Sequence, residues 1–149
     1  NLSIGLERRD FLKELSAFVC NSQEAGLLFC TDFSGLTPEE LADVISEKVI
    51  QARIPKLVVT VGSQGAVYAD MDGDKGVCPA RAVEVKDTTG AGDGFIGSFL
   101  WQLHRAGVTA ASLPGLSAET LTEALRLSNA FCGVSVQAHG AIDSYPTSL

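Results

Sequence analysis

A polar, glycine-rich turn holds the residues of this chain whose types and spacing could do chemistry. It spans Asp87–Asp93, with the sequence DTTGAGD, between a strand-like run at Ala82–Val85 and an apolar, helix-like run from Phe95 to Leu103. Its two glycines allow a tight turn and leave backbone N–H groups bare at the positive end of a helix dipole, which favours an anion. Asp93 adds a carboxylate beside that anion site. Phosphoryl transfer needs both features, because donors must hold the moving phosphoryl oxygens while a base accepts the proton of the attacking hydroxyl.

Two better-known phosphate loops do not match this turn. A Walker A loop needs Gly-Lys followed by Ser or Thr, whereas Gly92 is followed by Asp93. A dinucleotide fingerprint needs a third glycine three residues after Gly92, where Phe95 stands. An ordinary loop in which Asp93 caps a helix is the structural alternative. The complete seven-residue string with its strand and helix flanks favours the phosphate site.

The longer run Asp87–Phe95 resembles the signature of the ribokinase (PfkB) family of sugar and nucleoside kinases. Three further parts of that family's pattern follow in its order: an Asn-x-x-Glu motif in Cys20–Ala25, a nucleotide-side strand and turn in Val59–Ala66, and an adenine-side helix and loop in Ser128–Ala130 and Val134–Gly140. The stretch that ends in Ser144-Tyr145-Pro146 is most similar to ribokinases. The resemblance covers nearly the whole chain, but only the C-terminal half of the family fold.

The resemblance implies an α/β fold, a ribokinase-like three-layer sandwich of the Rossmann type. Residues 1–149 would form its C-terminal, nucleotide-binding and catalytic part, without the N-terminal sugar-binding part and lid. The chain also begins with Asn1 rather than Met, so we expect a fragment that binds nucleotide weakly and does not turn over alone. An exposed flank of its sheet would favour association. The full-length protein is expected to form a homodimer through the lid.

The activity implied by the resemblance is phosphorylation of a sugar hydroxyl by ATP, giving ribose 5-phosphate from D-ribose. The cofactors would be Mg²⁺ and K⁺. A nucleoside kinase or fructokinase of the same family is one alternative, and a non-catalytic nucleotide-binding module is another. Intact Asp93 argues against the non-catalytic module, whereas the missing N-terminal half argues for it.

The family signature assigns catalytic roles within the turn. Asp93 would be the general base and the residue in contact with the sugar, and the backbone from Gly90 through Ala91 and Gly92 to Asp93 would form an anion hole for the transferred phosphoryl group. Nucleotide contacts would come from Asn21, Thr60, Val61, Gly62, Ser63, Gln64, Gly65, Gly92, Asp93 and Asn129. A plain hairpin also explains the glycines at 62 and 65, and Asn129 also fits an ordinary polar position on a helix.

The two cations are implied by the resemblance in different ways. Glu24 would hold Mg²⁺ through water, which suits an ion that retains much of its hydration shell. Read alone, Asn21 and Glu24 also form a common helix capping box, and both roles can coexist. The potassium site would draw on Asp87, Thr89, Ser135, Ala138, Gly140 and Ser144.

Composition limits the class of protein. The 149 residues are 46% hydrophobic and 19% charged, which suits one globular domain with a real core. The net charge of −7 argues against a nucleic-acid partner. Four widely spaced residues, Cys20, Cys30, Cys78 and Cys132, favour buried free thiols in a reducing, cytoplasmic compartment. Neither a membrane span nor a signal-peptide pattern is evident, so we expect no membrane partner.

The remaining pattern alternates helices with strands. Thr37, Pro38 and Glu40 predict a helix start, followed by core positions at Leu41, Val44, Ile45 and Val49. Further predictions are a short helix over 9–15, a strand over 17–20, a strand over 56–61 with a hairpin partner at 66–69, strand over 76–85, a loop over 107–115 and a helix from Ser117 to Phe131. The helix after Gly92 would bury Phe95, Phe99 and Leu103, with Ile96 and Leu100 beside them and Trp101 as a packing residue.

Overall fold

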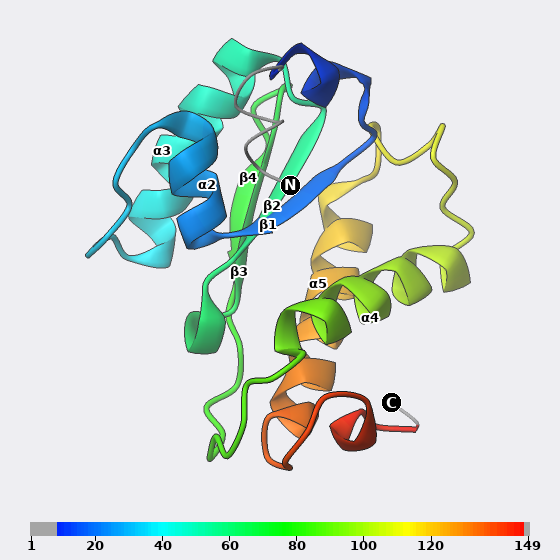
Figure 1. The fold of residues 1–149 in the computed structure, drawn as a ribbon. Helices are drawn as coiled ribbons and strands as arrows, with labels where there is room; N and C mark the ends of the chain where they lie inside the picture. The colour runs from blue at the N-terminus through cyan, green and yellow to red at the C-terminus, as the bar shows by residue number, and fades with distance from the viewer. Residues whose placement is uncertain (1–8, 148–149) are drawn as a thin grey trace. The chain divides into compact units, whose positions relative to one another are not determined.

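The computed structural model describes residues 9–147 and divides into two compact units (Figure 1). The first unit runs to Gly62 and includes Ala66–Val77. The second comprises Ser63–Gly65 and the chain from Cys78 onward. Each unit has its own packed elements.

The first unit is built on a sheet in the strand order β1-β2-β3-β4. The strands are β1 (Phe18–Asn21), β2 (Lys56–Thr60), β3 (Ala66–Asp70) and β4 (Lys75–Cys78). The first two are parallel, and β2 and β3 are antiparallel and joined by the 3₁₀ turn η2 (Gly62–Gln64). The predicted strand at 56–61 and its hairpin partner are therefore confirmed to within a residue.

The outer ends of the central hairpin carry a buried ion pair. Lys56 begins β2 and Asp70 ends β3, and the two residues are 1% and 4% exposed. The Lys56 Nζ atom lies 2.9 Å from Asp70 Oδ2, while Asp70 Oδ1 accepts the N–H groups of Asp72 and Asp74. The carboxylate thereby neutralises a buried cation and closes the turn into β4 at the same time.

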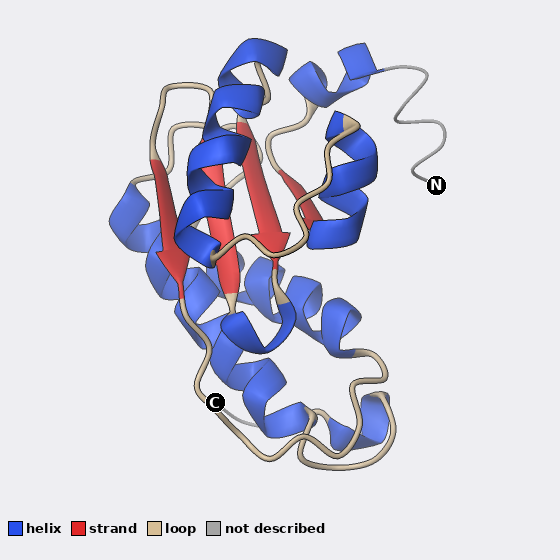
Figure 2. Ribbon diagram, turned by 90° about the vertical axis from the view of Figure 1, so that its left-hand side faces the viewer, coloured by secondary structure: helices blue, strands red, loops and turns tan. Residues whose placement is uncertain are grey.

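Two α-helices lie on the same side of this sheet, as Figures 1 and 2 show. These helices are α2 (Ser22–Phe29) and α3 (Pro38–Ala52), preceded by the 3₁₀ segment η1 (Arg9–Glu14). The core between helices and sheet includes Leu28, Ile45, Val49, Leu57, Val59, Val67 and Ala69. The predicted start of α3 is confirmed, because Thr37 accepts the Glu40 N–H at 3.2 Å and Glu40 accepts the Thr37 N–H at 2.8 Å.

In the second unit, α4 (Ala91–Arg105) packs against α5 (Ala118–Ser135), and the 3₁₀ turn η3 (Ile142–Ser144) follows. As predicted, α4 buries Phe95, Phe99 and Leu103. Ser117 caps α5, which continues four residues beyond the predicted end at Phe131. No helix or strand is found over the loop 107–115.

The strand predicted through Ala82–Val85 is wrong, because β4 ends at Cys78 and the next residues are irregular. Alternating side chains favour a strand only where a neighbouring strand accepts its hydrogen bonds. Here the N–H groups of Lys86 and Asp87 donate instead to the Val136 carbonyl, at 2.8 and 3.2 Å. The segment before the glycine-rich turn is therefore held by the end of α5.

Several apolar residues are more exposed than the sequence indicated. On α4, Ile96, Leu100 and Trp101 are 39%, 58% and 57% exposed, because this helix carries apolar residues over more of its circumference than α5 covers. Cys30 is exposed and Cys132 is half-buried, so burial holds fully only for Cys20 and Cys78.

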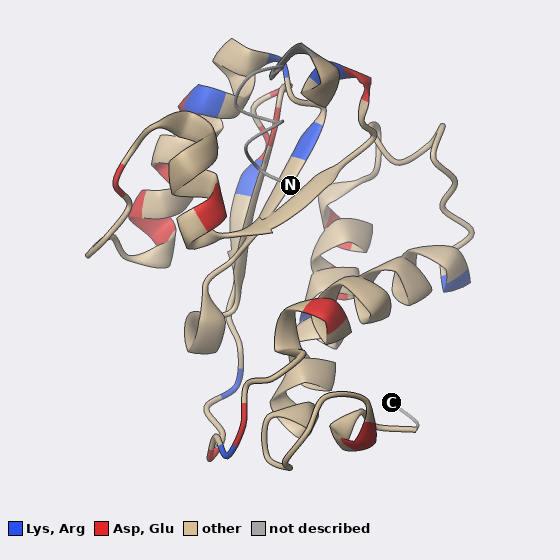
Figure 3. Ribbon diagram, in the orientation of Figure 1, with Lys and Arg blue, Asp and Glu red and all other residues tan. Residues whose placement is uncertain are grey.

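The described residues show no concentration of basic charge on one element. Figure 3 shows Lys and Arg scattered over several elements, with Asp and Glu between them. Among residues 9–147, none of the helices has the length and apolarity needed to cross a membrane.

Candidate phosphate-binding and catalytic site

The start of α4 lacks the side-chain cap found on the other described α-helices. In α2, α3 and α5 a cap side chain accepts the N–H of the third helical residue, and these caps are Asn21, Thr37 and Ser117. In α4 the capping position is Gly90, which has no side chain to offer. The N–H groups of Gly92 and Asp93 in the first turn therefore remain available to an anion.

The glycine at position 90 is required by both its conformation and its neighbours. Gly90 has φ 75° and ψ 3°, a left-handed conformation that side chains disfavour. A Cβ atom there would lie 2.7 Å from the Ala141 Cβ atom and 2.9 Å from the Tyr145 hydroxyl. A Cβ at Gly92 would instead meet no atom of residues 9–147 within 4 Å. Gly90 shapes the turn, whereas Gly92 leaves open space where a phosphate would approach.

Some N–H groups of the predicted anion hole are already hydrogen-bonded inside the turn, and others are not. The Ala91 N–H donates to the Thr88 carbonyl at 3.1 Å, and the Gly94 N–H donates to the Gly90 carbonyl at 2.8 Å. Of the four residues predicted for the anion hole, Ala91 thus uses its N–H within the turn. Gly92 and Asp93 are the better candidates for donors to a phosphoryl group.

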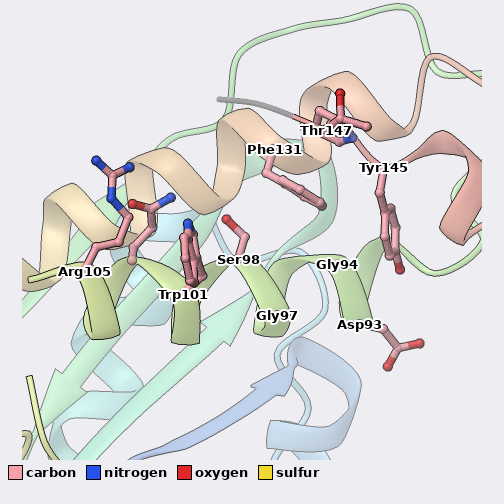
Figure 4. Close-up of a pocket in the computed structure, with 11 residues that line it drawn as sticks. Asp93, Gly94, Gly97, Ser98, Trp101, Arg105, Phe131, Tyr145 and Thr147 are labelled. Carbon is pink, nitrogen blue, oxygen red and sulfur yellow. The ribbon is translucent and has the colours of Figure 1, made fainter.

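Asp93 lies in the first turn of α4 with its side chain exposed. It lines a cavity of about 280 Å³ together with Gly94, Ser98, Phe131 and Tyr145. Figure 4 shows its carboxylate directed away from the helix at one end of this cavity. No hydrogen bond from the residues described here reaches that carboxylate, so both of its oxygens can accept a bond from a ligand hydroxyl.

Asp87 joins the glycine-rich turn to the C-terminal loop. Its Oδ1 atom accepts the Thr89 N–H and hydroxyl at 2.9 and 2.7 Å, and its Oδ2 atom accepts the Gly140 N–H at 2.9 Å. These bonds, the Gly140 one foremost, stabilise the carboxylate and lower the pKa of Asp87 to about 2. Three of the residues predicted for the potassium site are therefore in direct contact.

The other residues of that predicted set lie along the same loop. The Ser135 and Ser144 hydroxyls are 2.7 Å apart, and the Ser144 hydroxyl also donates to the Ala141 carbonyl at 2.7 Å. The Ala138 N–H donates to the Ser135 carbonyl at 3.1 Å. The segment thus gathers hydroxyl and carbonyl oxygens, which are the donors that hard cations prefer.

In the first unit, Asn21 and Glu24 form a complete capping box at the start of α2. Asn21 Oδ1 accepts the Glu24 N–H at 2.8 Å, and Glu24 Oε2 accepts the Asn21 N–H at 2.9 Å. The capping interpretation is confirmed, and their nucleotide and Mg²⁺ roles stay predictions.

The register of the parallel strands adds a point that the sequence pattern missed. Asn21 pairs with Thr60 at the carboxyl ends of β1 and β2. Ligands of open α/β sheets bind beyond such carboxyl ends, so the register brings two predicted nucleotide residues to one suitable edge. In the sequence, Asn21 directly follows the apolar run 17–20, and Thr60 is the second-last residue of the run 56–61.

The remaining predicted nucleotide residues have clear structural roles. Residues 61–65 form the β2–β3 connection, in which Gly62 and Gly65 have φ values of 60° and 106°. This confirms the hairpin alternative. In the second unit, Asn129 is buried and its Nδ2 atom donates to the Cys78 carbonyl at 2.9 Å. Its predicted adenine contact would have to use the other side of the amide.

Two residues that sequence reasoning did not assign to the site contact its backbone. The Tyr145 hydroxyl donates to the Gly90 carbonyl at 2.7 Å, and the Cys132 Sγ atom lies 3.3 Å from the Ala91 carbonyl oxygen. Burial raises the pKa of Cys132 to about 11, so the thiol keeps its proton at neutral pH and can donate. Neither contact follows from local spacing.

These features define a class of protein: an α/β fold in which a helix N-terminus without a side-chain cap presents backbone N–H groups beside a carboxylate. The chain belongs to the pfkB family of carbohydrate kinases, whose family model matches residues 8–148. It is 36% identical to a mouse ribokinase over 132 residues, which cover 88% of this chain and 37% of the relative.

Solved structures agree with this family. An Arabidopsis thaliana ribokinase in complex with ribose and ATP matches with a TM-score of 0.70 at 26% identity, covering 92% of this chain and 39% of the other. A Vibrio cholerae fructokinase bound to fructose, ADP and calcium matches with a TM-score of 0.72 at 25% identity, covering 93% and 40%. The chain therefore spans less than half the length of the relatives that it matches.

Proposed function

We propose that this chain supplies the nucleotide-phosphate and catalytic part of an ATP-dependent sugar kinase, with D-ribose as the acceptor and ribose 5-phosphate as the product. The observation that carries the proposal is the start of α4, where open N–H groups at Gly92 and Asp93 adjoin the Asp93 carboxylate, which accepts no hydrogen bond from residues 9–147. The family supports a kinase acting on a carbohydrate. The similarity to a mouse ribokinase supports ribose as the sugar.

In the proposed reaction, Asp93 accepts the proton of the sugar hydroxyl as that oxygen bonds to the γ-phosphorus. The bond from this phosphorus to the bridging oxygen breaks, and ADP leaves with its electron pair. The Gly92 and Asp93 N–H groups donate to the phosphoryl oxygens during the transfer. Because such a transition state is loose, positioning and electrostatic stabilisation carry most of the catalysis.

Within the first unit, Asn21, Thr60 and Glu24 are proposed to contact nucleotide phosphates and their metal ion. Asn21 and Thr60 stand at adjacent strand ends, and Glu24 Oε1 accepts no hydrogen bond from the part of the chain that the structure describes. That oxygen is free for a water of a Mg²⁺ ion, which would neutralise phosphate charge when bound. Residues 9–147 contain no cluster of three His, Cys, Asp or Glu side chains suited to a metal. We propose that nucleotide phosphates and water supply most of the Mg²⁺ ligands.

We also propose that a potassium ion binds oxygen atoms of the residues predicted for it. Asp87 and Thr89 come from the glycine-rich turn, and Ser135, Gly140 and Ser144 come from the end of α5 and the loop after it. A monovalent cation there would add positive charge behind the turn. The chain's own contribution is the Asp87 bridge, which keeps the turn and the loop together.

The test is the substitution Asp93→Asn in the full-length protein, followed by a coupled assay of ADP release with ribose, fructose and adenosine. We expect turnover to fall by about 10²–10⁴-fold while ATP binding is retained. Glu119→Gln is the matched control, because Glu119 is an exposed carboxylate in the first turn of α5. Turnover of the Asp93→Asn variant within tenfold of wild type would reject Asp93 as the base.

The same assay addresses the acceptor. The similarity to the Vibrio cholerae fructokinase favours fructose as the second candidate. A larger kcat/KM for fructose or for adenosine than for ribose would replace ribose in the proposal. The non-catalytic alternative is tested by two measurements together. It predicts that MgATP binds when titrated into the 149-residue chain, and that the full-length protein releases no ADP.

A further inference from the structure

The glycine at the α4 cap makes the position of the turn depend on contacts from elsewhere in the second unit. A side-chain cap normally fixes the peptide groups at the start of a helix. Gly90 supplies none, and glycine reaches many backbone conformations at little cost. The direction of the Gly92 and Asp93 N–H groups therefore has to be set by other residues.

Tyr145 makes one such contact. Its hydroxyl donates to the Gly90 carbonyl at 2.7 Å, and the same carbonyl accepts the Gly94 N–H at 2.8 Å. The two donors together orient the peptide group that joins Gly90 to the first residue of α4. Since the hydroxyl acts as a donor to a carbonyl, it does not compete with an anion for the open N–H groups.

The ring of Tyr145 is itself held in place. It lies 5.4 Å from the Phe131 ring, centroid to centroid, at an interplanar angle of 57°. A Cβ atom at Gly94 would stand 3.1 Å from this ring and 3.2 Å from Phe131. The glycine thus gives the two rings room beside the first turn of α4. Figure 4 shows Tyr145 next to Gly94, with its hydroxyl end toward the end of α4 that carries Asp93.

We propose that Tyr145 is a positioning residue that aligns the Gly90–Asp93 turn for the transferred phosphoryl group. The inference rests on the proposed function, since it concerns the same anion site. Tyr145 touches neither the phosphate nor the acceptor in this proposal. It acts through the Gly90 carbonyl. Because this hydrogen bond already orients the turn, the N–H groups of Gly92 and Asp93 need not reorganise when the phosphate binds.

The test compares Tyr145→Phe with Tyr68→Phe. Tyr145→Phe removes one hydroxyl and keeps the ring that packs on Phe131 and Gly94. Tyr68 is the only other tyrosine, and it lies in β3 of the first unit, with its ring beside Gly76. We expect Tyr145→Phe to raise the Kd for MgATP about three- to tenfold, as the loss of one hydrogen bond predicts, and the Kd for MgADP less than twofold. Tyr68→Phe should leave the ratio of the two constants unchanged.

The ratio of the Kd for MgATP to the Kd for MgADP distinguishes a positioning role of Tyr145 from a purely structural one. A structural defect would weaken the binding of both nucleotides alike, and that result would overturn the inference. So would a Tyr145→Phe variant with wild-type constants for both nucleotides.

Hydrogen exchange provides a readout that needs no ligand. The Gly94 amide should exchange about three- to tenfold faster in Tyr145→Phe, because its acceptor carbonyl has lost its second anchor. If the wild-type full-length protein binds no ATP, the proposed function fails, and this exchange rate alone decides whether Tyr145 orders the turn. Unchanged exchange would overturn that role too.

Discussion

Substitution of the two glycines of the turn by alanine should have opposite effects on stability. Gly90 is left-handed and crowded by Ala141 and Tyr145, whereas Gly92 lies in the first turn of α4 with open space beside it. We therefore expect Gly90→Ala to destabilise the second unit and Gly92→Ala to stabilise it.

The magnitudes follow from the geometry. An alanine in the left-handed region costs about 1–2 kcal/mol. Pushing a methyl group to within 2.7 Å of the Ala141 Cβ atom requires repacking that costs about 1–3 kcal/mol. The free energy of unfolding should thus fall by about 2–5 kcal/mol in Gly90→Ala. Gly92→Ala should raise it by about 0.4–1 kcal/mol, because the unfolded chain loses backbone freedom.

Urea denaturation followed by tryptophan fluorescence measures this directly. The chain has one tryptophan, Trp101, and it lies on α4, so its signal reports on the second unit. Equal stability of the two variants would contradict the assigned backbone conformation of Gly90. Titration with MgATP adds a second check, since the methyl group of Gly92→Ala would enter the proposed phosphate site. That variant should gain stability while it loses nucleotide affinity.

Three further predictions concern single groups in the two units. Asp70→Asn should lower the free energy of unfolding by about 3–5 kcal/mol, measured by urea denaturation with far-ultraviolet circular dichroism, because it leaves the buried Lys56 ammonium unpaired; a change below 1 kcal/mol would contradict that burial. The Gly140 amide resonance should titrate with a midpoint near pH 2, since the pKa of Asp87 is lowered from 3.8 to about 2. The stabilisation from Asp87 is thus present above pH 3.8 and lost as the pH falls through 2. A midpoint near pH 4 would refute the hydrogen bond from the Gly140 N–H to Asp87. Ser98→Ala should raise thermal stability, because the buried Ser98 hydroxyl has no hydrogen-bond partner among the described residues and alanine favours a helix; a lower melting temperature would indicate a partner for that hydroxyl.

Local patterns in the sequence predicted much of the fold correctly. The capping box at Thr37 and Glu40, the apolar strand from Lys56 and the buried face of α4 all appeared where expected. Each depends on residues within a few positions of one another, where spacing maps directly onto hydrogen bonds or onto one face of a helix. The glycine-rich turn was also predictable from local sequence, because its glycines indicate a tight turn without reference to distant residues.

The errors came where distant neighbours decided the outcome. Ala82–Val85 has the alternation of a strand, but no strand of the described part of the chain pairs with it, and the end of α5 accepts the N–H groups that follow. Trp101 has the size of a core residue, yet it is 57% exposed on α4. Propensity and periodicity describe a segment's own preferences and not the surface that it finally meets.

The amino-acid sequence alone determined which chemical groups are present, namely a turn of small residues at Gly90–Gly92 with backbone N–H donors, followed by the carboxylate of Asp93. Only the tertiary structure decided how that turn is held, because Tyr145 reaches the Gly90 carbonyl from 55 positions further along the chain. A hydrogen bond across such a separation depends on the packing of α4, α5 and the segment after them. No local pattern encodes that packing, since it comes from the free energy of the whole unit.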